Sequence, residues 1–246
     1  KLVDYDGMCV PALVGDEPFE FIGHPYTDVT TLDGLKDWMS GTIGRWSYAQ
    51  QLYGHVYSAR RGTMGELVPF GRARNDEHIS IEGFEPGSPD PVWLWAASFV
   101  ARTAVFTSAD VGRPTQTGEQ NGIKPAPAGQ RFILNERQSL LTNGIATQTY
   151  EGGSVRIERA ITTYQRNAYG QPDDSYLDSE TMHQVGYSMR RLRSVVTSKF
   201  GRYKLADDGT NFGDGAAIVT PMTIRAEMIA VYREMERDGI VENTEL

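Results

Sequence analysis

Short strand-like segments alternate with helix-like segments over the first 110 residues, and this order leaves few folds open. Thr30 or Thr31 is suited to cap the first helix, and Pro91 opens an apolar run that fits a buried helix because Arg102 is its only charge. The expected elements are strands at 19–22, 52–59 and 78–81 and helices at 30–39 and 91–106. Strands that alternate with helices predict an α/β layer with a mainly parallel sheet.

The stretch from Asp110 to Gly129 breaks this pattern. It is rich in Gly, Pro and polar residues, and its apolar residues follow no period. Long segments of this kind are typical of surface connections between domains. We therefore expect two domains, at residues 1–125 and 126–246.

A β-hairpin is the clearest local prediction in the second half. Strand-like runs at 145–150 and 154–164 flank Glu151-Gly152-Gly153, a sequence suited to a tight turn. The expected helices lie at 135–141, stopped by Asn143-Gly144; at 175–200, with Ser175 and Asp178 as a capping box; and from Pro221 to Gly239, with Ile224, Met228, Val231 and Met235 on one face. This part of the chain is therefore expected to be a smaller α+β domain.

Charge is unevenly distributed along the chain. The formal net charge is -8, yet the stretch 190–204 contains six basic residues and no acidic one. These six are Arg190, Arg191, Arg193, Lys199, Arg202 and Lys204. Six of the 24 Lys and Arg residues lie in this stretch, so the rest of the chain contains 18 basic residues and all 32 acidic residues. Three interpretations remain open: a protein partner or a second copy with an acidic face, pairing with carboxylates of the same subunit, or nucleic acid.

Few residues point to chemistry at a site. The four histidines, at 24, 55, 78 and 183, stand in no metal-binding motif, and the single cysteine, Cys9, excludes an internal disulfide. The segment 207–215 (DDGTNFGDG) could offer oxygen ligands to Ca²⁺, but its spacing is not that of an EF-hand, and the same residues are typical of tight turns. No phosphate loop is present, and no apolar run reaches the roughly 18 residues that a membrane span needs.

Several long blocks together resemble the tail sheath proteins of Mu-like contractile phages. The likeness covers nearly the whole chain and is densest after Arg131. The blocks are GRWSYAQQLYGHVYSA (44–59), RFILNERQSLLTNGIATQTY (131–150), VRIERAITTYQRNAYGQPDDSYLD (155–178), KFGRYKLADDGTNFGDGAAIVTP (199–221) and AEMIAVYREMERDGIVEN (226–243).

The resemblance implies both a fold and a function. It implies a subtilisin-like, non-catalytic α/β domain followed by a smaller α+β C-terminal sheath domain with the hairpin and the long helices. It implies a structural virion subunit without cofactors, made and assembled in the host cytoplasm, that forms stacked hexameric rings around the tail tube. The implied partners are other sheath subunits, joined through extended terminal arms that add strands to neighbouring sheets, together with the tube, the baseplate and the tail terminator, and neither nucleic acid nor membrane. Contraction of the sheath would drive the tube through the host envelope.

The chain departs from a complete sheath protein at both ends. It begins with Lys1 and, compared with the family, lacks the N-terminal region and the C-terminal arm, so we expect this fragment to be monomeric. The six basic residues of 190–204 are expected to contact the tube or a neighbouring subunit. A rival interpretation is an active subtilisin-like hydrolase, but Ser40-Gly41-Thr42 and Gly62-Thr63-Met64 do not match the nucleophile motif, and neither His24 nor His55 stands in the usual H-G-T context. The second rival is a nucleic-acid-binding module that uses 190–204.

Overall fold

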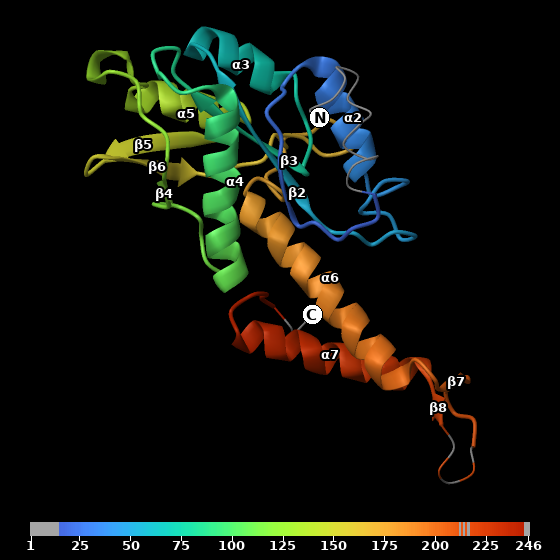
Figure 1. The fold of residues 1–246 in the computed structure, drawn as a ribbon. Helices are drawn as coiled ribbons and strands as arrows, with labels where there is room; N and C mark the ends of the chain where they lie inside the picture. Colours follow the sequence, from blue (N-terminus) through green and yellow to red (C-terminus); the bar gives the residue numbers. More distant parts are fainter. Residues whose placement is uncertain (1–14, 212, 214, 216, 244–246) are drawn as a thin grey trace. The chain divides into compact units, whose positions relative to one another are not determined.

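In the computed structural model, which describes residues 15–211, 213, 215 and 217–243, three parallel strands form the centre of the first part of the chain (Figure 1). They are β1 (Phe21–Gly23), β2 (His55–Arg61) and β3 (Ile79–Phe84), in that order across the sheet. Helix α2 (Val29–Met39) lies between β1 and β2 in the chain, and α3 (Met64–Arg72) lies between β2 and β3. The predicted α/β layer with a parallel sheet is therefore confirmed. Cys9 lies outside the described residues.

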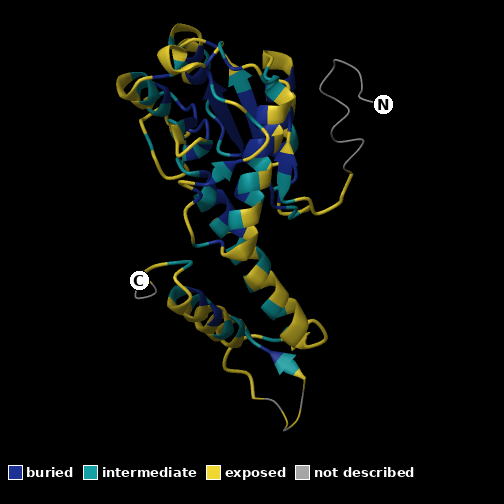
Figure 2. Ribbon diagram, turned by 60° about the vertical axis from the view of Figure 1, so that its left-hand side comes forward, coloured by how far each residue is buried: buried dark blue, intermediate teal, exposed yellow. Residues whose placement is uncertain are grey.

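Helices cover both faces of this sheet. Successive residues of a strand point to opposite faces, and β2 shows this directly. Val56 packs in one cluster with Leu32 and Leu35 of α2. Its neighbour Tyr57 packs in another cluster with Phe99 of α4 (Val92–Ala109), with ring centroids 5.1 Å apart. The sheet is thus the middle layer of three, and the buried residues gather around it (Figure 2).

Helix α4 is less buried than its sequence suggests. Trp95 and Phe99 are fully buried against the sheet, but Trp93 is 64% exposed and Val105 is 59% exposed. By length and composition alone, α4 could cross a membrane, a test that core helices of soluble proteins also pass. The prediction of a buried helix is therefore correct for one face of α4 only.

The predicted hairpin is confirmed. Strands β5 (Thr147–Glu151) and β6 (Ser154–Arg159) pair antiparallel, and β4 (Glu119–Gln120) adds a third strand beside β6. Gly152 and Gly153 both have positive φ, at 61° and 91°, which a two-residue turn between twisted strands requires. The N–H of Gly83 donates to the carbonyl of Ala146 at 2.9 Å, so the hairpin sheet adjoins β3. The second strand ends at Arg159 rather than at residue 164.

Several element boundaries differ from the predicted ones. Helix α2 begins after Asp28, whose carboxylate accepts a 2.9 Å bond from the N–H of Thr31, so Thr30 and Thr31 are not its cap. Helix α6 (Ser179–Phe200) begins four residues later than expected, because Asp178 pairs with Arg159 instead of forming a capping box with Ser175. Helix α5 spans Leu134–Thr142, close to the predicted 135–141.

Helix α3 is absent from the prediction. Gly65, Pro69 and Gly71 all oppose a helix by propensity, and they hide the apolar pattern. A start signal is nevertheless present, because the backbone N–H of Thr63 donates to the carboxylate of Glu66 at 2.8 Å. Gly71 is buried where α3 meets the segment after α5.

The contacts divide the chain into two compact units, up to His183 and from Gln184 onward. The first unit contains both sheets, and the connection at 110–129 lies within it, with β4 and the short 3-10 helix η1 (Ala128–Gln130). The second unit contains most of α6, the two-stranded ribbon β7 (Lys204–Leu205) and β8 (Ile218–Val219), and α7 (Pro221–Arg237). The division at residue 125 stays a prediction.

Candidate protein–protein interface

The second unit has a small hydrophobic core. Among its described residues, only three with an apolar side chain are buried: Val219, Val231 and Met235. Its partly uncovered large apolar side chains are Val185, Met189, Tyr203, Leu205, Met222, Met228 and Ile229. Apolar surface of this extent on so small a unit is typical of a face that meets another protein.

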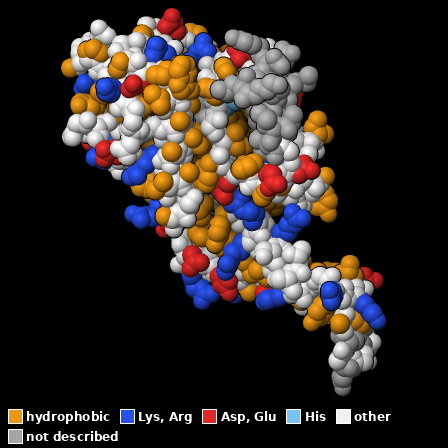
Figure 3. Space-filling model, viewed as in Figure 1, with side chains coloured by type: hydrophobic (Ala, Val, Ile, Leu, Met, Phe, Trp, Pro, Cys, Tyr) orange, Lys and Arg blue, Asp and Glu red, His pale blue; other side chains and the backbone are white. Residues whose placement is uncertain are grey.

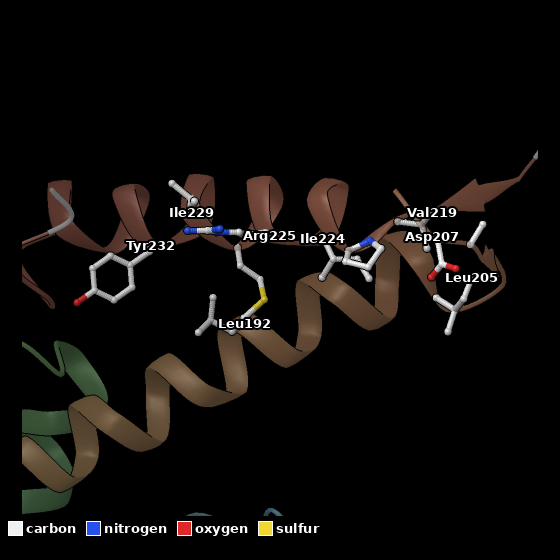
Figure 4. Close-up of a pocket in the computed structure, with 11 residues that line it drawn as sticks. Leu192, Leu205, Asp207, Val219, Ile224, Arg225, Ile229 and Tyr232 are labelled. Atoms are coloured by element: carbon white, nitrogen blue, oxygen red, sulfur yellow. The ribbon is translucent and has the colours of Figure 1, made fainter. Parts of the chain in front are cut away.

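An apolar groove of about 800 Å³ runs along the first three turns of α7 (Figure 4). Leu192 of α6 lies opposite α7 in this groove, and the ribbon β7–β8 supplies Leu205 and Val219. The predicted apolar face of α7 is divided between two roles. Val231 and Met235 are buried, whereas Ile224 and Met228 line the groove. The start of α7 therefore offers an apolar surface to a partner.

The six basic residues of 190–204 do not form one cluster. Arg191 pairs with Glu234 of α7 at 3.2 Å, Lys199 pairs with Glu227 of α7, and Arg190 is partly buried and already makes an interaction. Exposed pairs like these stabilise a fold by at most about 1 kcal/mol each. For Arg191 and Lys199, pairing within the subunit is thus the arrangement that the structure shows.

The other three basic residues are exposed. Arg193, Arg202 and Lys204 make no ion pair with any residue that the structure describes. Arg202 and Lys204 adjoin Tyr203 and Leu205, which are 45% and 80% exposed. We call residues 202–205 the cationic edge. It combines charge and apolar surface beside the groove, and among the described residues no third strand pairs with its two-stranded ribbon.

A serine and a histidine lie close together in the interior of the first unit. A hydrolase would need such a pair at an accessible surface. His55 Nε2 and Ser80 Oγ lie 2.8 Å apart on neighbouring strands, and both residues are fully buried. No described residue bonds His55 Nδ1, and burial lowers the pKa of His55 well below its usual value. The nearby carboxylate, Glu20, lies 3.2 Å from a different histidine, His183, which in turn meets the hydroxyl of Tyr57 at 2.8 Å.

This network has the character of a buried polar core and not of a catalytic triad. A triad needs one histidine between the nucleophile and an orienting carboxylate, with access for substrate. Here Ser80 and Glu20 bond to two different histidines. No local pattern in the chain indicates this network, because it depends on the pairing of β2 with β3 and on the packing of the start of α6.

The residues that the structure describes contain no group of three His, Cys, Asp or Glu side chains close enough to hold a metal ion. In the 207–215 loop, Asp208 accepts a bond from the N–H of Met222 at 3.1 Å, and the hydroxyl of Thr210 donates to the carbonyl of Asp207 at 3.1 Å. The first bond joins the loop to the start of α7, and the second is a bond of a turn. Positions 212 and 214 lie outside the described residues, so the ion-site alternative stays a prediction.

Two family models match almost the whole chain. The phage tail sheath protein central domain matches residues 6–163, and the phage tail sheath C-terminal domain matches residues 171–246. The Mu-like prophage FluMu tail sheath protein of Haemophilus influenzae is 39% identical over 233 residues, covering 94% of this chain and 47% of that protein. The chain thus spans about half the length of this relative.

Solved structures show the same fold at low identity. The crystal structure of a sheath tail protein from Desulfitobacterium hafniense superposes with a TM-score of 0.66 at 14% identity, over 95% of this chain and 49% of that one. A chain of the baseplate of the anti-feeding prophage, solved by cryo-EM, gives a TM-score of 0.54 at 11% identity, over 94% of this chain and 57% of that one.

Proposed function

This chain belongs to the phage tail sheath protein family, and from that premise we propose that it is the body of a structural subunit of a contractile phage tail, working in the virion by packing against copies of itself. The observation that carries this proposal is the pair of family models, which together match residues 6–163 and 171–246. The second unit supports it physically, since its own residues leave the apolar groove and the cationic edge exposed, and hydrophobic and basic side chains both lie on its surface (Figure 3).

Finer features of the sheath are part of the proposal. Subunits form stacked hexameric rings around the tail tube, contact the baseplate and the tail terminator, and contract to drive the tube through the host envelope. Residues 1–125 are a subtilisin-like domain, and the parallel sheet with helices on both faces is compatible with that architecture. Contraction needs bodies that stay rigid while their interfaces are exchanged. The buried central sheet would supply that rigidity.

We also propose that the subunit has no catalytic activity and needs no cofactor. Ser80, the serine that meets His55, is fully buried, and no described residue provides the third member of a triad at His55 Nδ1. A nucleophile without access to solvent cannot receive a substrate.

The interface proposal concerns three residues. Arg193, Arg202 and Lys204 carry the positive charge of 190–204 that is not paired within the described chain, and we place them against the acidic face of a neighbouring subunit or of the tube. Arg191 and Lys199 form ion pairs with α7, so in this proposal they stabilise the second unit and do not contact a partner.

Charge reversal in the full-length sheath protein tests this assignment. The double variant Arg202→Glu, Lys204→Glu should keep its melting temperature, because both side chains are exposed, yet should produce few normal contractile tails by negative-stain microscopy. The matched control is Arg113→Glu, an exposed arginine of the first unit without an ion pair among the described residues. Normal tails from the double variant, or equally defective tails from the control, would contradict the assignment.

A further inference from the structure

A buried carboxyl group joins the two sheets of the first unit. Glu82 of β3 is fully buried, and the side chain of Gln120 in β4 is 2% exposed. Gln120 Nε2 donates a hydrogen bond to Glu82 Oε1 at 2.8 Å. Because β3 belongs to the parallel sheet and β4 to the antiparallel sheet, this bond crosses between them.

Each of these two side chains has one oxygen without a partner. Glu82 Oε2 and Gln120 Oε1 are both buried, and no described residue bonds to either of them. An ionised carboxylate can only accept hydrogen bonds, as can the amide oxygen. If Glu82 were ionised, two acceptors would be left unsatisfied in the interior, one of them charged, and both are costly there.

A single proton on Glu82 would give both of these oxygens a hydrogen-bond partner. We propose that Glu82 is held as a neutral carboxylic acid whose Oε2 hydroxyl donates to Gln120 Oε1, closing a two-bond acid–amide pair that acts as a proton-dependent joint between β3 and β4. Both oxygens that lacked a partner are then engaged, one as donor and the other as acceptor. β4 lies in the long connection from α4 to α5, so loss of this proton loosens the connection from the sheet.

The surroundings of Glu82 favour the neutral form. Burial, with a smaller contribution from the nearby negative charge of Glu85, raises the pKa of Glu82 to about 8, although the bond from Gln120 acts in the opposite direction. Glu85 itself has donors, since the N–H of Phe132 bonds its Oε1 at 3.0 Å and Gln148 Nε2 lies 3.4 Å from its Oε2. Glu82 makes no ion pair with any residue of the described chain.

The charged groups on the surrounding elements are engaged elsewhere. Three ion pairs involve β4 and β6: Glu119 with Arg156 at 3.8 Å, Glu158 with Arg137 at 2.8 Å, and Arg159 with Asp178 at 2.8 Å. Arg131 donates a hydrogen bond to the carbonyl of Ala126 at 2.8 Å. The guanidinium of Arg102 in α4 lies 4.1 Å from the ring centroid of Phe106. On β2 the residue opposite Glu82 is Ala59, which carries no charge. Among the residues that the structure describes, no cation pairs with Glu82 in place of the proton.

The sign of the pH effect follows from this arrangement. A glutamate in the unfolded chain has a pKa of about 4.3, so between that pH and about 8 the folded chain holds one proton more than the unfolded chain. Stability from Glu82 is complete below the unfolded pKa and is lost as the pH rises through the folded pKa. Over that window, each pH unit of increase lowers the folding equilibrium constant about tenfold.

Substitution Glu82→Gln tests the proposal, because an amide at this position supplies both bonds without a titrating proton. We expect the variant to be at least as stable as the unmodified chain at about pH 7.5, and its folding constant to lack the tenfold loss per pH unit. The matched control is Glu119→Gln, which lies next to Gln120 on β4 but is partly exposed and should keep the pH slope of the unmodified chain. An unchanged slope in Glu82→Gln, or a loss of stability at every pH, would overturn the proposal.

A measurement on the unmodified chain avoids dependence on how the variant folds. With ¹³C-labelled glutamate, the infrared spectrum should show the C=O band of a neutral carboxylic acid at about pH 6 and lose it by about pH 10. Absence of the band at the lower pH would refute the neutral form. Stabilisation by Ca²⁺ or Mg²⁺ that Glu82→Gln abolishes would also overturn it, since it would show that a metal ion and not a proton fills the site.

Discussion

Two glycines in α3 should respond in opposite ways to the same substitution. Gly71 is buried, and a Cβ there would meet the backbone carbonyl oxygen of Asn143 and would lie 2.7 Å from Cγ1 of Ile145. Gly65 lies in the same helix but is exposed, and the nearest atom to a Cβ there is the Thr63 hydroxyl at 3.9 Å. Gly→Ala therefore adds only helix propensity at residue 65, and it adds a clash with the backbone at residue 71.

The magnitudes follow from these contacts. At Gly65, an exposed position in the first turn of α3, alanine should stabilise the fold by at most about 0.5–1 kcal/mol, because a helix favours Ala over Gly. At Gly71 the same gain is outweighed by overpacking, which costs about 1–3 kcal/mol and more where backbone has to move. We therefore expect a net loss of about 1–2 kcal/mol or more, and a gap of about 2–3 kcal/mol between the two variants.

Urea unfolding followed by tryptophan fluorescence is the suitable assay. All four tryptophans, at 38, 46, 93 and 95, belong to the first unit, so the signal reports the unit that contains α3. In thermal unfolding the gap corresponds to about 4–12 °C at about 2–4 °C per kcal/mol. Equal stabilisation by both substitutions would show that α3 does not pack on the segment after α5, and the described packing of the first unit would be wrong there.

Two further predictions concern the isolated chain. At moderate concentration it should sediment as a monomer; a ring or a sheath-like polymer in analytical ultracentrifugation would contradict that. A serine-directed fluorophosphonate should leave the chain unlabelled, since Ser80 is fully buried beside His55, and stoichiometric labelling that Ser80→Ala abolishes would revive the hydrolase interpretation.

The sequence predicted the architecture well where the signals were local. The alternation of apolar segments identified the parallel sheet and its helices, and the two glycines after Glu151 identified the hairpin. Helix α3 was missed because Gly65, Pro69 and Gly71 lower its helix propensity, although Thr63 and Glu66 mark its start. Tertiary packing outweighed propensity in that helix.

The candidate interface was predicted less completely than the fold, for a physical reason. Sequence locates six basic residues in one stretch, but only the pairing of α6 with α7 shows that Glu234 and Glu227 engage Arg191 and Lys199. The contact between Glu82 and Gln120 joins residues 38 positions apart and depends on how β4 pairs with β6. Neither kind of contact leaves a local pattern in the chain.

A cryo-EM map of the intact extended tail would test the sheath assignment most directly. With this chain fitted unit by unit, we expect the groove of α7 and the cationic edge at 202–205 to be covered by a neighbouring subunit or by the tube. A map in which that groove and that edge face open solvent in both the extended and the contracted tail would contradict the account.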